Sequence, residues 1–339
     1  MKFVGFGELL VRLNPEGYYK FPQANCFNVG YTGAEANIAV SLSYMGVPSS
    51  FVTELPKNEI ADCAIRRLMM YGVQTNDIIR KGERIGVYYL EKGASQRPSK
   101  IVYDRKYSAV SQSKREDYDW DAIMNGATWF HFTGITVGLS PNMADICKDA
   151  CIAAHKAGAT VSCDLNYRKN LWSPEQAQAT MKSLMQYVDI LIGNEEDTEK
   201  VLGIRADDSD ITGGKLSIAG YEKVARQLVD VYGFKAVATT LRGSVSASIN
   251  EWSALLYKDG EFRTSKNYTI QLVDRVGGGD SFSAGLIYGF MNGYSNQKTL
   301  EFATAASCLK QTMEQDFNLA SVEDVLNLVN GNGSGRVQR

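Results

Sequence analysis

The sequence has no surplus of basic residues and no long hydrophobic run. Its 339 residues include 36 Lys and Arg against 38 Asp and Glu, which gives a formal net charge of −2. A nucleic-acid-binding surface needs an excess of positive charge, so no nucleic-acid partner is expected. The apolar run at the N-terminus is interrupted at Glu8 and Arg12 and is too short for a signal sequence or a membrane span. We therefore expect a cytoplasmic protein without membrane contact.

Histidine is scarce, and the cysteines follow no redox or zinc motif. The six cysteines show no C-x-x-C spacing. Cys147, Cys151 and His155 share one face of an expected helix and could hold a metal, but the small apolar residues between them favour an ordinary half-buried helix. The other of the two histidines, His131, lies in the apolar run TWFHF, which predicts a buried strand. Acid–base chemistry is therefore expected from carboxylates.

Two common nucleotide-binding motifs are also missing. No G-x-x-x-x-G-K-[ST] occurs anywhere in the sequence, which excludes a P-loop enzyme. No G-x-G-x-x-G follows the first expected strand, which argues against a dinucleotide-binding protein.

Short apolar runs alternate with helical stretches over most of the chain. This rhythm predicts an α/β fold in which a mostly parallel central sheet carries helices on both faces. After the strand at 235–241, the runs SVSASIN, SALLY and GEFRTS predict an antiparallel meander. The expected strands are 2–7, 49–55, 129–134, 159–166, 188–194 and 235–241; the expected helices are 33–45, 59–71, 142–156, 174–187, 195–202, 218–232, 280–291 and 297–313.

Two segments interrupt this rhythm. Residues 11–31 and 85–107 are rich in Tyr and Phe and alternate in polarity without helical spacing. They predict a small separate sheet inserted into a core of residues 1–10, 32–84 and 108–330. Such a sheet could form a lid over the carboxyl ends of the core strands; edge hairpins without a role are the alternative. Residues 331–339 are expected to form a flexible tail.

The clearest chemical signal is the segment Asp274–Phe282, with the sequence DRVGGGDSF, which precedes an expected helix. Three consecutive glycines, Gly277 to Gly279, allow backbone N–H groups to converge. The positive end of the helix adds to them, so the segment predicts a phosphate-binding site. Asp280 could be a plain helix N-cap, although an N-cap needs no glycines in front of it.

This segment resembles the second signature of the ribokinase-like (PfkB) carbohydrate kinases, D-T-x-G-A-G-D, with Arg275 and Gly278 at the Thr and Ala positions. Residues 33–39 are similar to the family's first signature, with Thr32 in place of its first Gly, and Asn194 to Asp197 resemble its N-x-x-E motif. The resemblance implies a catalytic base at Asp280 and an anion hole formed by Gly277, Gly278 and Gly279. It also implies Mg²⁺ held through water near Asn194 and Asp197.

Within that family, the chain is most similar to 2-keto-3-deoxygluconate kinases. An Arg can bind a carboxylate bidentately, and a Tyr offers a flat face and a hydroxyl to a polyol. Taken singly, Tyr88 and Tyr103 could be a cross-strand pair, the arginines surface charges, and Asp316 a turn cap with Asn318. The resemblance implies that the sugar acid is bound by Gly33, Asn37, Tyr88, Tyr103, Arg105, Arg168, Asp280 and Asp316, with Arg105 also stabilising the transferred phosphoryl group.

The nucleotide side is less distinctive. Related kinases carry a Gly-containing ATP loop at the position of 240–244, but Arg242 and Val245 replace two of its glycines. Ala303, Ala306 and Ser307 could flank an adenine or simply allow close helix packing. The expected ATP contacts are Asn166, Arg168, Asn194, Arg242, Gly243, Gly277 and Gly279.

The sequence therefore predicts an ATP- and Mg²⁺-dependent sugar-acid kinase acting on the C6 hydroxyl of 2-dehydro-3-deoxy-D-gluconate. Another kinase of the same fold, acting on fructose, a nucleoside or a 5-keto sugar acid, is the nearest alternative. A non-catalytic sugar-acid sensor and, more distantly, a dehydrogenase are the others. The exposed lid sheet predicts a homodimer formed through it.

Overall fold

The computed structural model describes residues 1–205 and 218–331. In this part of the chain, a ten-stranded sheet has the order β13-β12-β11-β10-β9-β8-β1-β4-β5, with β14 paired to β12. The strands from β11 to β5 along this path are parallel, whereas β12, β13 and β14 run antiparallel to their neighbours. The strands are β1 (Phe3–Phe6), β4 (Ser49–Leu55), β5 (Ile78–Arg80), β8 (Trp129–Thr133), β9 (Thr160–Asp164), β10 (Ile190–Gly193), β11 (Ala236–Ser244), β12 (Ile249–Lys258), β13 (Glu261–Thr264) and β14 (Tyr268–Gln271).

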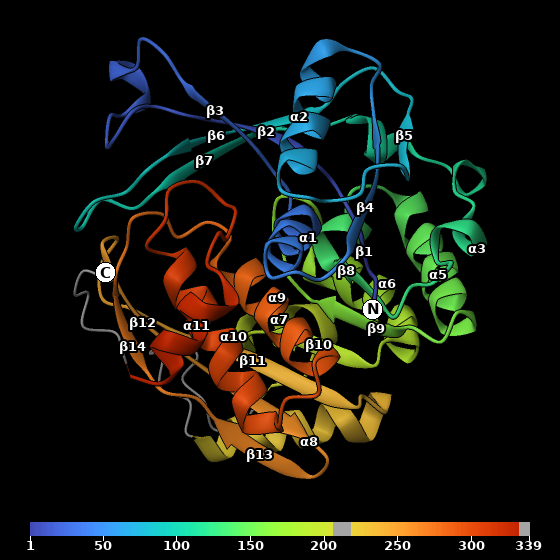
Figure 1. Cartoon of the computed structure of the whole chain (residues 1–339), viewed down its shortest axis with the longest axis vertical. Helices are drawn as coiled ribbons and strands as arrows, with labels where there is room; N and C mark the ends of the chain where they lie inside the picture. Colours follow the sequence, from blue (N-terminus) through green and yellow to red (C-terminus); the bar gives the residue numbers. More distant parts are fainter. Residues whose placement is uncertain (206–217, 332–339) are drawn as a thin grey trace.

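Helices cover both faces of this sheet, as the sequence predicts (Figure 1). Each face has its own hydrophobic cluster, so the central strands are buried on both sides. One cluster involves α1 (Ala34–Tyr44), α2 (Glu59–Met70), α9 (Gly278–Met291), α10 (Asn296–Lys310) and α11 (Val322–Val329). The other involves α3 (Trp120–Ile123), α4 (Gly134–Val137), α5 (Pro141–Lys156), α6 (Pro174–Leu184), α7 (Glu195–Leu202) and α8 (Ile218–Tyr232). Short 3₁₀ turns are η1 (Phe21–Gln23), η2 (Ala109–Gln112), η3 (Arg115–Asp117) and η4 (Met185–Tyr187).

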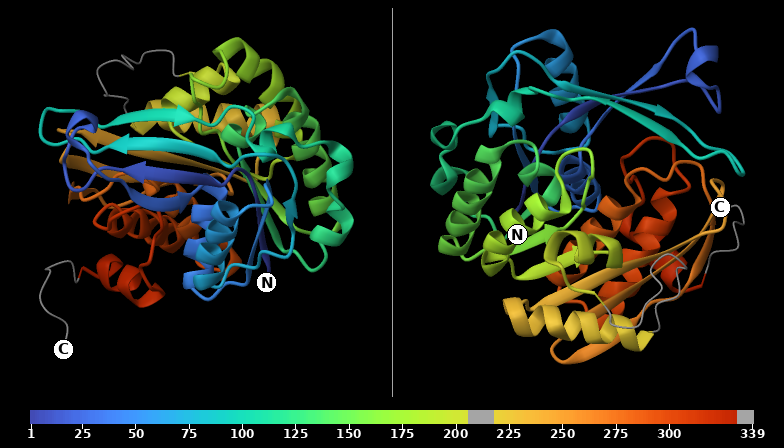
Figure 2. Two further views of the ribbon diagram at one scale, coloured as in Figure 1. Left: turned by 90° about the horizontal axis from the view of Figure 1, so that it is seen from above. Right: turned by 180° about the vertical axis from the view of Figure 1, so that it is seen from behind.

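The two interrupting segments form a separate four-stranded sheet, as expected. Its order is β3-β2-β6-β7, and Figure 2 shows the four strands side by side above the core. Register pairs Gly30, Arg12, Tyr88 and Tyr103 across one face, and Val29, Leu13, Tyr89 and Val102 across the other. We call this sheet the lid sheet; its strands are β2 (Leu10–Asn14), β3 (Asn28–Thr32), β6 (Gly86–Glu91) and β7 (Lys100–Asp104).

Two expected elements differ from the structure. Residues 245–248, expected within a strand, form the turn between β11 and β12, where Val245 and Ser246 donate backbone hydrogen bonds to Ile249. Helix α9 begins at Gly278, two residues before Asp280, because Gly277 takes the left-handed conformation that opens the helix (φ +83°). Of the expected tail, residues 332–339 lie outside the described residues.

The candidate metal-binding face of α5 is an ordinary packed helix. Cys147 and Cys151 are fully buried in the core, whereas His155 lies near Asp189 at 3.3 Å. Within residues 1–205 and 218–331, no group of His, Cys, Asp or Glu side chains is arranged to hold a metal ion by itself. His131 is buried, as predicted, and burial lowers its pKa to about 3. No helix in the described ranges is long and apolar enough to cross a membrane.

Candidate active site

A cavity of about 490 Å³ lies between the lid sheet and the carboxyl ends of the core strands. Glu8 follows β1, Asp164 ends β9, and Gly193 ends β10, so three of the parallel core strands direct their ends into it. Ligands of open α/β sheets bind at this edge. The lid sheet contributes Tyr88 and Tyr103 from the opposite side. The cavity is therefore the candidate active site.

The glycine-rich loop forms one wall of the cavity. A Cβ atom on Gly277 would lie 2.2 Å from the backbone oxygen of Asp316, and its φ of +83° also requires glycine. A Cβ on Gly279, in contrast, would meet no atom of the described residues within 4 Å beyond its chain neighbours and the backbone of its own helix. The protein itself thus requires glycine at 277 but leaves open space at 279, on the side where a ligand would lie. The first N–H groups of α9 have no acceptor within the helix and can face an anion there.

Asp280 is the third residue of α9, so the N-cap interpretation is wrong. Its Oδ2 accepts a hydrogen bond of 2.6 Å from Asn37 Nδ2. The Asn37 Oδ1 atom accepts from the Gly33 backbone N–H at 3.4 Å and lies 2.9 Å from the Thr32 hydroxyl oxygen, which fixes the orientation of the amide. Burial raises the pKa of Asp280 to about 6; the Asn37 contact opposes this shift and nearby Asp316 adds to it. A carboxylate with that pKa is suited to accept a proton near neutral pH.

Two further carboxylates, Asp164 and Asp197, lie near Asp280 at the strand ends. Burial raises the pKa of Asp164 well above its usual range, and repulsion from Asp197 and Asp280 adds to the effect. Burial also raises the pKa of Asp197 to about 6, although Arg168 opposes the shift. Such a cluster is strained unless a cation or protons reduce its charge. Asp164 was missed in the sequence, where its place at the end of a buried strand was the available signal.

Asn194 and Asp197 hold each other rather than pointing freely into the cavity. Asn194 caps α7 by accepting from the Asp197 backbone N–H at 2.8 Å, and its amide donates to Asp197 Oδ2 at 2.9 Å. Asp197 Oδ1 accepts from the Tyr167 backbone N–H at 3.2 Å. Because both residues have these protein partners, contact with a metal through water fits them better than direct ligation.

Four arginines line the cavity, and three of them, Arg168, Arg242 and Arg275, form no ion pair with a carboxylate in the described residues. Arg168 donates to its neighbour's backbone at Tyr167, Arg275 donates to the Asn250 amide oxygen at 3.3 Å, and Arg242 lies 5.7 Å from the Trp252 ring. Burial lowers the pKa of Arg242, and repulsion from Arg275 and Arg168 adds to this. Guanidinium groups without ion pairs at a cavity wall can bind a multiply charged anion. Arg275 was not assigned a role in the sequence.

Side chains of the lid sheet line the cavity on the side opposite the strand ends. Tyr88 is buried, and its hydroxyl donates to Asp316 at 2.8 Å, while its ring lies 5.9 Å from that of Tyr103. The two tyrosines thus form the expected cross-strand pair and also line the cavity. Arg105 pairs with the buried Glu8, a residue missed in the sequence, so that part of its charge is already compensated.

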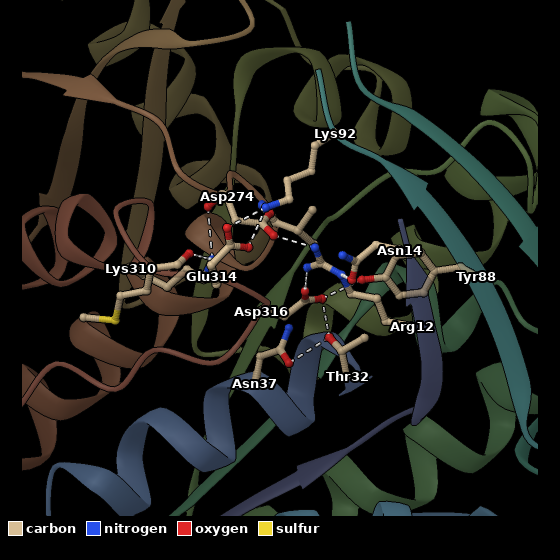
Figure 3. Close-up of polar contacts among 12 residues, drawn as sticks. Arg12, Asn14, Thr32, Asn37, Tyr88, Lys92, Asp274, Lys310, Glu314 and Asp316 are labelled. Carbon is tan, nitrogen blue, oxygen red and sulfur yellow. Dashed lines mark hydrogen bonds and ion pairs between the residues drawn. The ribbon is translucent and has the colours of Figure 1, made fainter. Parts of the chain in front are cut away.

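Asp316 connects the lid sheet to the core (Figure 3). It accepts hydrogen bonds from Arg12, the Thr32 hydroxyl and the Tyr88 hydroxyl. Arg12, fully buried on β2, also pairs with Asp274 at the start of the glycine-rich loop. Burial disfavours the charge on Arg12, but Asp316 and Asp274 more than compensate and raise its pKa. The turn-cap interpretation of Asp316 is therefore wrong, and Arg12 is a further residue that was missed.

Most of the site residues expected from the sequence meet in this one cavity. Gly243 does not, because residues 240–244 belong to β11 and pair with β12 instead of forming the expected ATP loop. Ala303, Ala306 and Ser307 are buried on α10; Ala303 lies against Gly285 of α9, and the Ser307 hydroxyl donates to the Gly278 carbonyl at 2.7 Å. These small residues serve helix packing. The predicted residues that line the cavity are Gly33, Asn37, Tyr88, Tyr103, Arg105, Asn166, Arg168, Asn194, Asp197, Arg242, Gly277, Gly278, Gly279, Asp280 and Asp316.

Known proteins match nearly the whole chain. The family described as pfkB family carbohydrate kinase matches residues 3–316. A crystal structure of 2-dehydro-3-deoxygluconokinase from Thermotoga maritima is 49% identical, with a TM-score of 0.94 and coverage of 98% of both chains. The 2-dehydro-3-deoxygalactonokinase of Haloferax volcanii is 28% identical over 98% of both sequences. An E. coli structure described as a ribokinase II in complex with ATP and Mg²⁺ shares the fold at 22% identity, with a TM-score of 0.81, over 97% of this chain and 99% of that one.

Proposed function

Because the chain belongs to the pfkB family of carbohydrate kinases, we propose that it phosphorylates 2-dehydro-3-deoxygluconate at its terminal C6 hydroxyl with ATP. The observation that carries the proposal is the meeting of Asp280, the glycine-rich loop and three arginines without ion pairs in the described residues, all in one cavity. The name and 49% identity of the Thermotoga maritima relative support the choice of substrate. The dehydrogenase alternative is wrong, since the chain is a kinase. An ATP-consuming reaction also fits the cytoplasmic location expected from the sequence.

In the proposed reaction, Asp280 accepts the proton of the substrate hydroxyl. The oxygen then forms a bond to the γ-phosphorus of ATP, and the bond from that phosphorus to the β,γ-bridging oxygen breaks, releasing ADP. The N–H groups at the start of α9 stabilise the charge on the transferred phosphoryl group. Asn37 holds the carboxylate of Asp280 in place for this transfer. Of the three arginines, Arg242 and Arg275 face the phosphates in this arrangement.

The residues at the strand ends fit a Mg²⁺ ion that is bound mainly through ATP and water. Mg²⁺ prefers oxygen ligands and keeps several waters. Asp164 and Asp197 supply carboxylates whose raised pKa values reflect burial and, for Asp164, mutual repulsion that a cation would relieve. When bound, the ion would neutralise phosphate charge. Asn194 would orient Asp197 toward its waters through the 2.9 Å contact.

The sugar acid would lie between the lid sheet and the core. Tyr88 and Tyr103 would cover the carbon chain of the sugar acid, while Gly33 and Asn37 would contact its hydroxyls. Within the described residues, Arg168 forms no ion pair with a carboxylate, and we expect it to bind the substrate carboxylate. Arg105, already paired with Glu8, would add a hydrogen bond to the substrate rather than a full charge.

A panel of sugars tests this proposal. ATP consumption should be fastest with 2-dehydro-3-deoxygluconate and slower with its galacto epimer, 5-dehydro-2-deoxygluconate, fructose and ribose. The galacto epimer is the second candidate because the Haloferax volcanii relative is a 2-dehydro-3-deoxygalactonokinase. A higher kcat/KM for the epimer would reassign the substrate, and a preference for neutral sugars would remove the sugar-acid proposal. An enzyme that binds the acid without consuming ATP would support the sensor alternative.

We also propose a homodimer formed through the lid sheet. The face turned away from the cavity carries the row Val29, Leu13, Tyr89 and Val102. Val29 is 46% exposed and Val102 is 52% exposed, and Phe27 packs against Tyr89 at the rim. An apolar sheet face of this kind is stabilised by a partner, and a second copy offers the same row. Val102→Lys should give a monomer in size-exclusion chromatography with light scattering, whereas Ile152→Lys on α5 should leave the mass unchanged; a monomeric parent would contradict the proposal.

A further inference from the structure

The side chain of Lys310 is fully buried beneath the glycine-rich loop. Lys310 is the last residue of α10 and has no exposed surface. Its ammonium donates to the backbone oxygen of Asp274 at 3.1 Å and approaches that of Met313 at 3.5 Å. In the described part of the chain, no carboxylate lies within ion-pair distance of it. The reaction proposed above gives this cation no role.

A buried ammonium is costly, so its position needs a physical reason. Burial lowers the pKa of Lys310, and the charges of Asp274 and Asp316 oppose that shift and favour the protonated form. The C-terminal end of α10 also favours a cation. The ammonium thus has the surroundings of a small monovalent cation: carbonyl oxygens as direct partners and carboxylates farther out.

What Lys310 holds is the first residue of the phosphate-binding loop. Figure 3 shows Lys310 and Arg12 approaching Asp274 from opposite sides. Arg12 binds the side chain of Asp274, whereas Lys310 binds its main-chain oxygen. The backbone N–H of Asp274 is also held, by the carbonyl of Gln311 at 3.3 Å. Three residues after Asp274, the chain turns through Gly277 into α9, where its N–H groups face the cavity.

We propose that Lys310 is a positioning residue that acts as a tethered monovalent cation. It fixes the carbonyl of Asp274 and thereby holds residues 274–279 in the conformation that receives the transferred phosphoryl group. Its charge, covalently attached, replaces a free cation from solution at this position. The inference rests on phosphoryl transfer at Asp280, as proposed above, and adds the element that preorganises the loop.

Substitution of the charge tests this role. Lys310→Met keeps most of the volume but removes the ammonium, and should lower kcat about 10- to 100-fold while changing KM for the sugar little. Lys298→Met, the same substitution at an exposed position of α10, should leave kcat unchanged. The sugar used is whichever member of the panel the parent phosphorylates fastest, so a wrong substrate assignment would appear in the parent and would leave this comparison intact.

Chemical rescue separates positioning from a merely structural role. Lys310→Ala leaves a space that small cations can enter, so ammonium or propylammonium should restore part of kcat, whereas the bulky tetramethylammonium at equal ionic strength should not. The parent should show the same kcat in potassium and tetramethylammonium chloride. A parent-like kcat in Lys310→Met, a parent that requires potassium, or a folded Lys310→Ala that no small cation restores would each overturn the proposal. If Lys310→Ala does not fold, the proposal is tested by the kcat of Lys310→Met and by the kcat of the parent in the two salts.

Discussion

Asn37 Nδ2 donates to Asp280 Oδ2 at 2.6 Å and so connects the segments of the two family signatures, although the two residues are 243 positions apart in the chain. Asn37 lies in the first turn of α1 and Asp280 in the first turn of α9, so two helix N-termini meet at the proposed catalytic base. The hydrogen bond favours the ionised carboxylate, while burial disfavours it and raises its pKa to about 6. The base is thus held in place and still able to accept a proton.

Asp280→Asn should abolish most activity without loss of sugar binding. The amide keeps the shape and can still accept from Asn37, but it cannot take the proton, so kcat should fall by ~10²–10⁴. Calorimetry should show a sugar Kd close to that of the parent. A variant that keeps more than about a tenth of the parent's kcat would show that another group is the base.

The same substitution should stabilise the fold at alkaline pH. The pKa of Asp280 is raised in the folded protein, from 3.8 to about 6, so ionisation of the carboxylate destabilises the fold as pH rises through this range. Removing that charge should increase the free energy of unfolding by roughly 1–3 kcal/mol at pH 8. Denaturation at pH 3.5 should show no such gain. An equal gain at both pH values would point to packing instead of charge.

The fall of kcat/KM on the acidic side of its pH profile should reflect protonation of Asp280. Activity requires the ionised carboxylate, so kcat/KM should fall tenfold per pH unit below about 6. Asp197 also has a pKa raised to about 6 by burial, and Asp197→Asn serves as the control. That variant should be slower but keep the fall at acidic pH. If the fall of kcat/KM at acidic pH disappears in Asp197→Asn, the titrating group is Asp197 and not Asp280.

Two glycines of the same loop should respond differently to alanine. Gly277→Ala should unfold or strongly destabilise the protein, because the Cβ would lie 2.2 Å from the Asp316 carbonyl at a positive φ. Gly279→Ala should fold with unchanged or slightly higher Tm, since its Cβ would meet nothing within 4 Å among the described residues outside its own helix. Its kcat should nevertheless fall at least tenfold if the space belongs to the phosphates. Full activity in Gly279→Ala would place the transferred phosphoryl group elsewhere.

Arg12→Ala should be among the most destabilising changes at the lid sheet. It leaves Asp274 and Asp316 buried without their cation, and breaking a buried pair in this way costs about 3–5 kcal/mol. Urea denaturation measures the loss, with Arg115→Ala at the exposed pair with Asp149 as the control of small effect. Equal losses in the two variants would contradict the special role of the buried network.

The sequence predicted helices and strands correctly where their position depends on the local pattern of apolar residues. Apolar periodicity placed β4 at its observed bounds and α2, α5 and α7 within a residue or two, because both faces of these elements follow simple burial patterns. Tyr-rich alternation identified the lid sheet for the same reason. Residues 245–248 were wrongly assigned to a strand because Val245 favours a strand, whereas serine occurs in strands and turns, and the pairing of β11 with β12 decides where the turn lies.

The missed residues act through contacts between distant segments. In the sequence, Arg12 has no feature that distinguishes it from a surface arginine. In the structure, β2 pairs with β6 so that Arg12 lies beside Tyr88, and from this position it contacts Asp316. The role of Glu8 follows from its ion pair with Arg105, which lies 97 residues away in the chain. Asp164 could have been found, since a polar residue ending a buried strand lies at the ligand-binding edge. Pairings such as that of Arg12 with Asp316 depend on tertiary arrangement, which composition and spacing do not contain.

Arg168 should determine whether the enzyme prefers a sugar acid. Its guanidinium lines the cavity, is exposed, and contacts only the backbone oxygen of Tyr167 among the hydrogen bonds of the described residues. A charged hydrogen bond to a substrate carboxylate is worth about 1.5–3 kcal/mol, or one to two powers of ten in affinity. Arg168→Ala should therefore raise KM for 2-dehydro-3-deoxygluconate about 10- to 100-fold.

The matched comparison is with a neutral sugar in the same variant. KM for fructose should change little in Arg168→Ala, and Arg168→Lys should recover only part of the affinity for the acid, since Lys keeps the charge but loses the planar fork. Arg168 also lies close enough to Asp197 and Arg242 to affect their pKa values, so a role toward phosphate is the competing explanation. If Arg168→Ala lowers kcat equally for both sugars, Arg168 belongs to the phosphoryl-transfer machinery. Selectivity for the acid would then have to come from the tyrosines and Arg105 of the lid sheet.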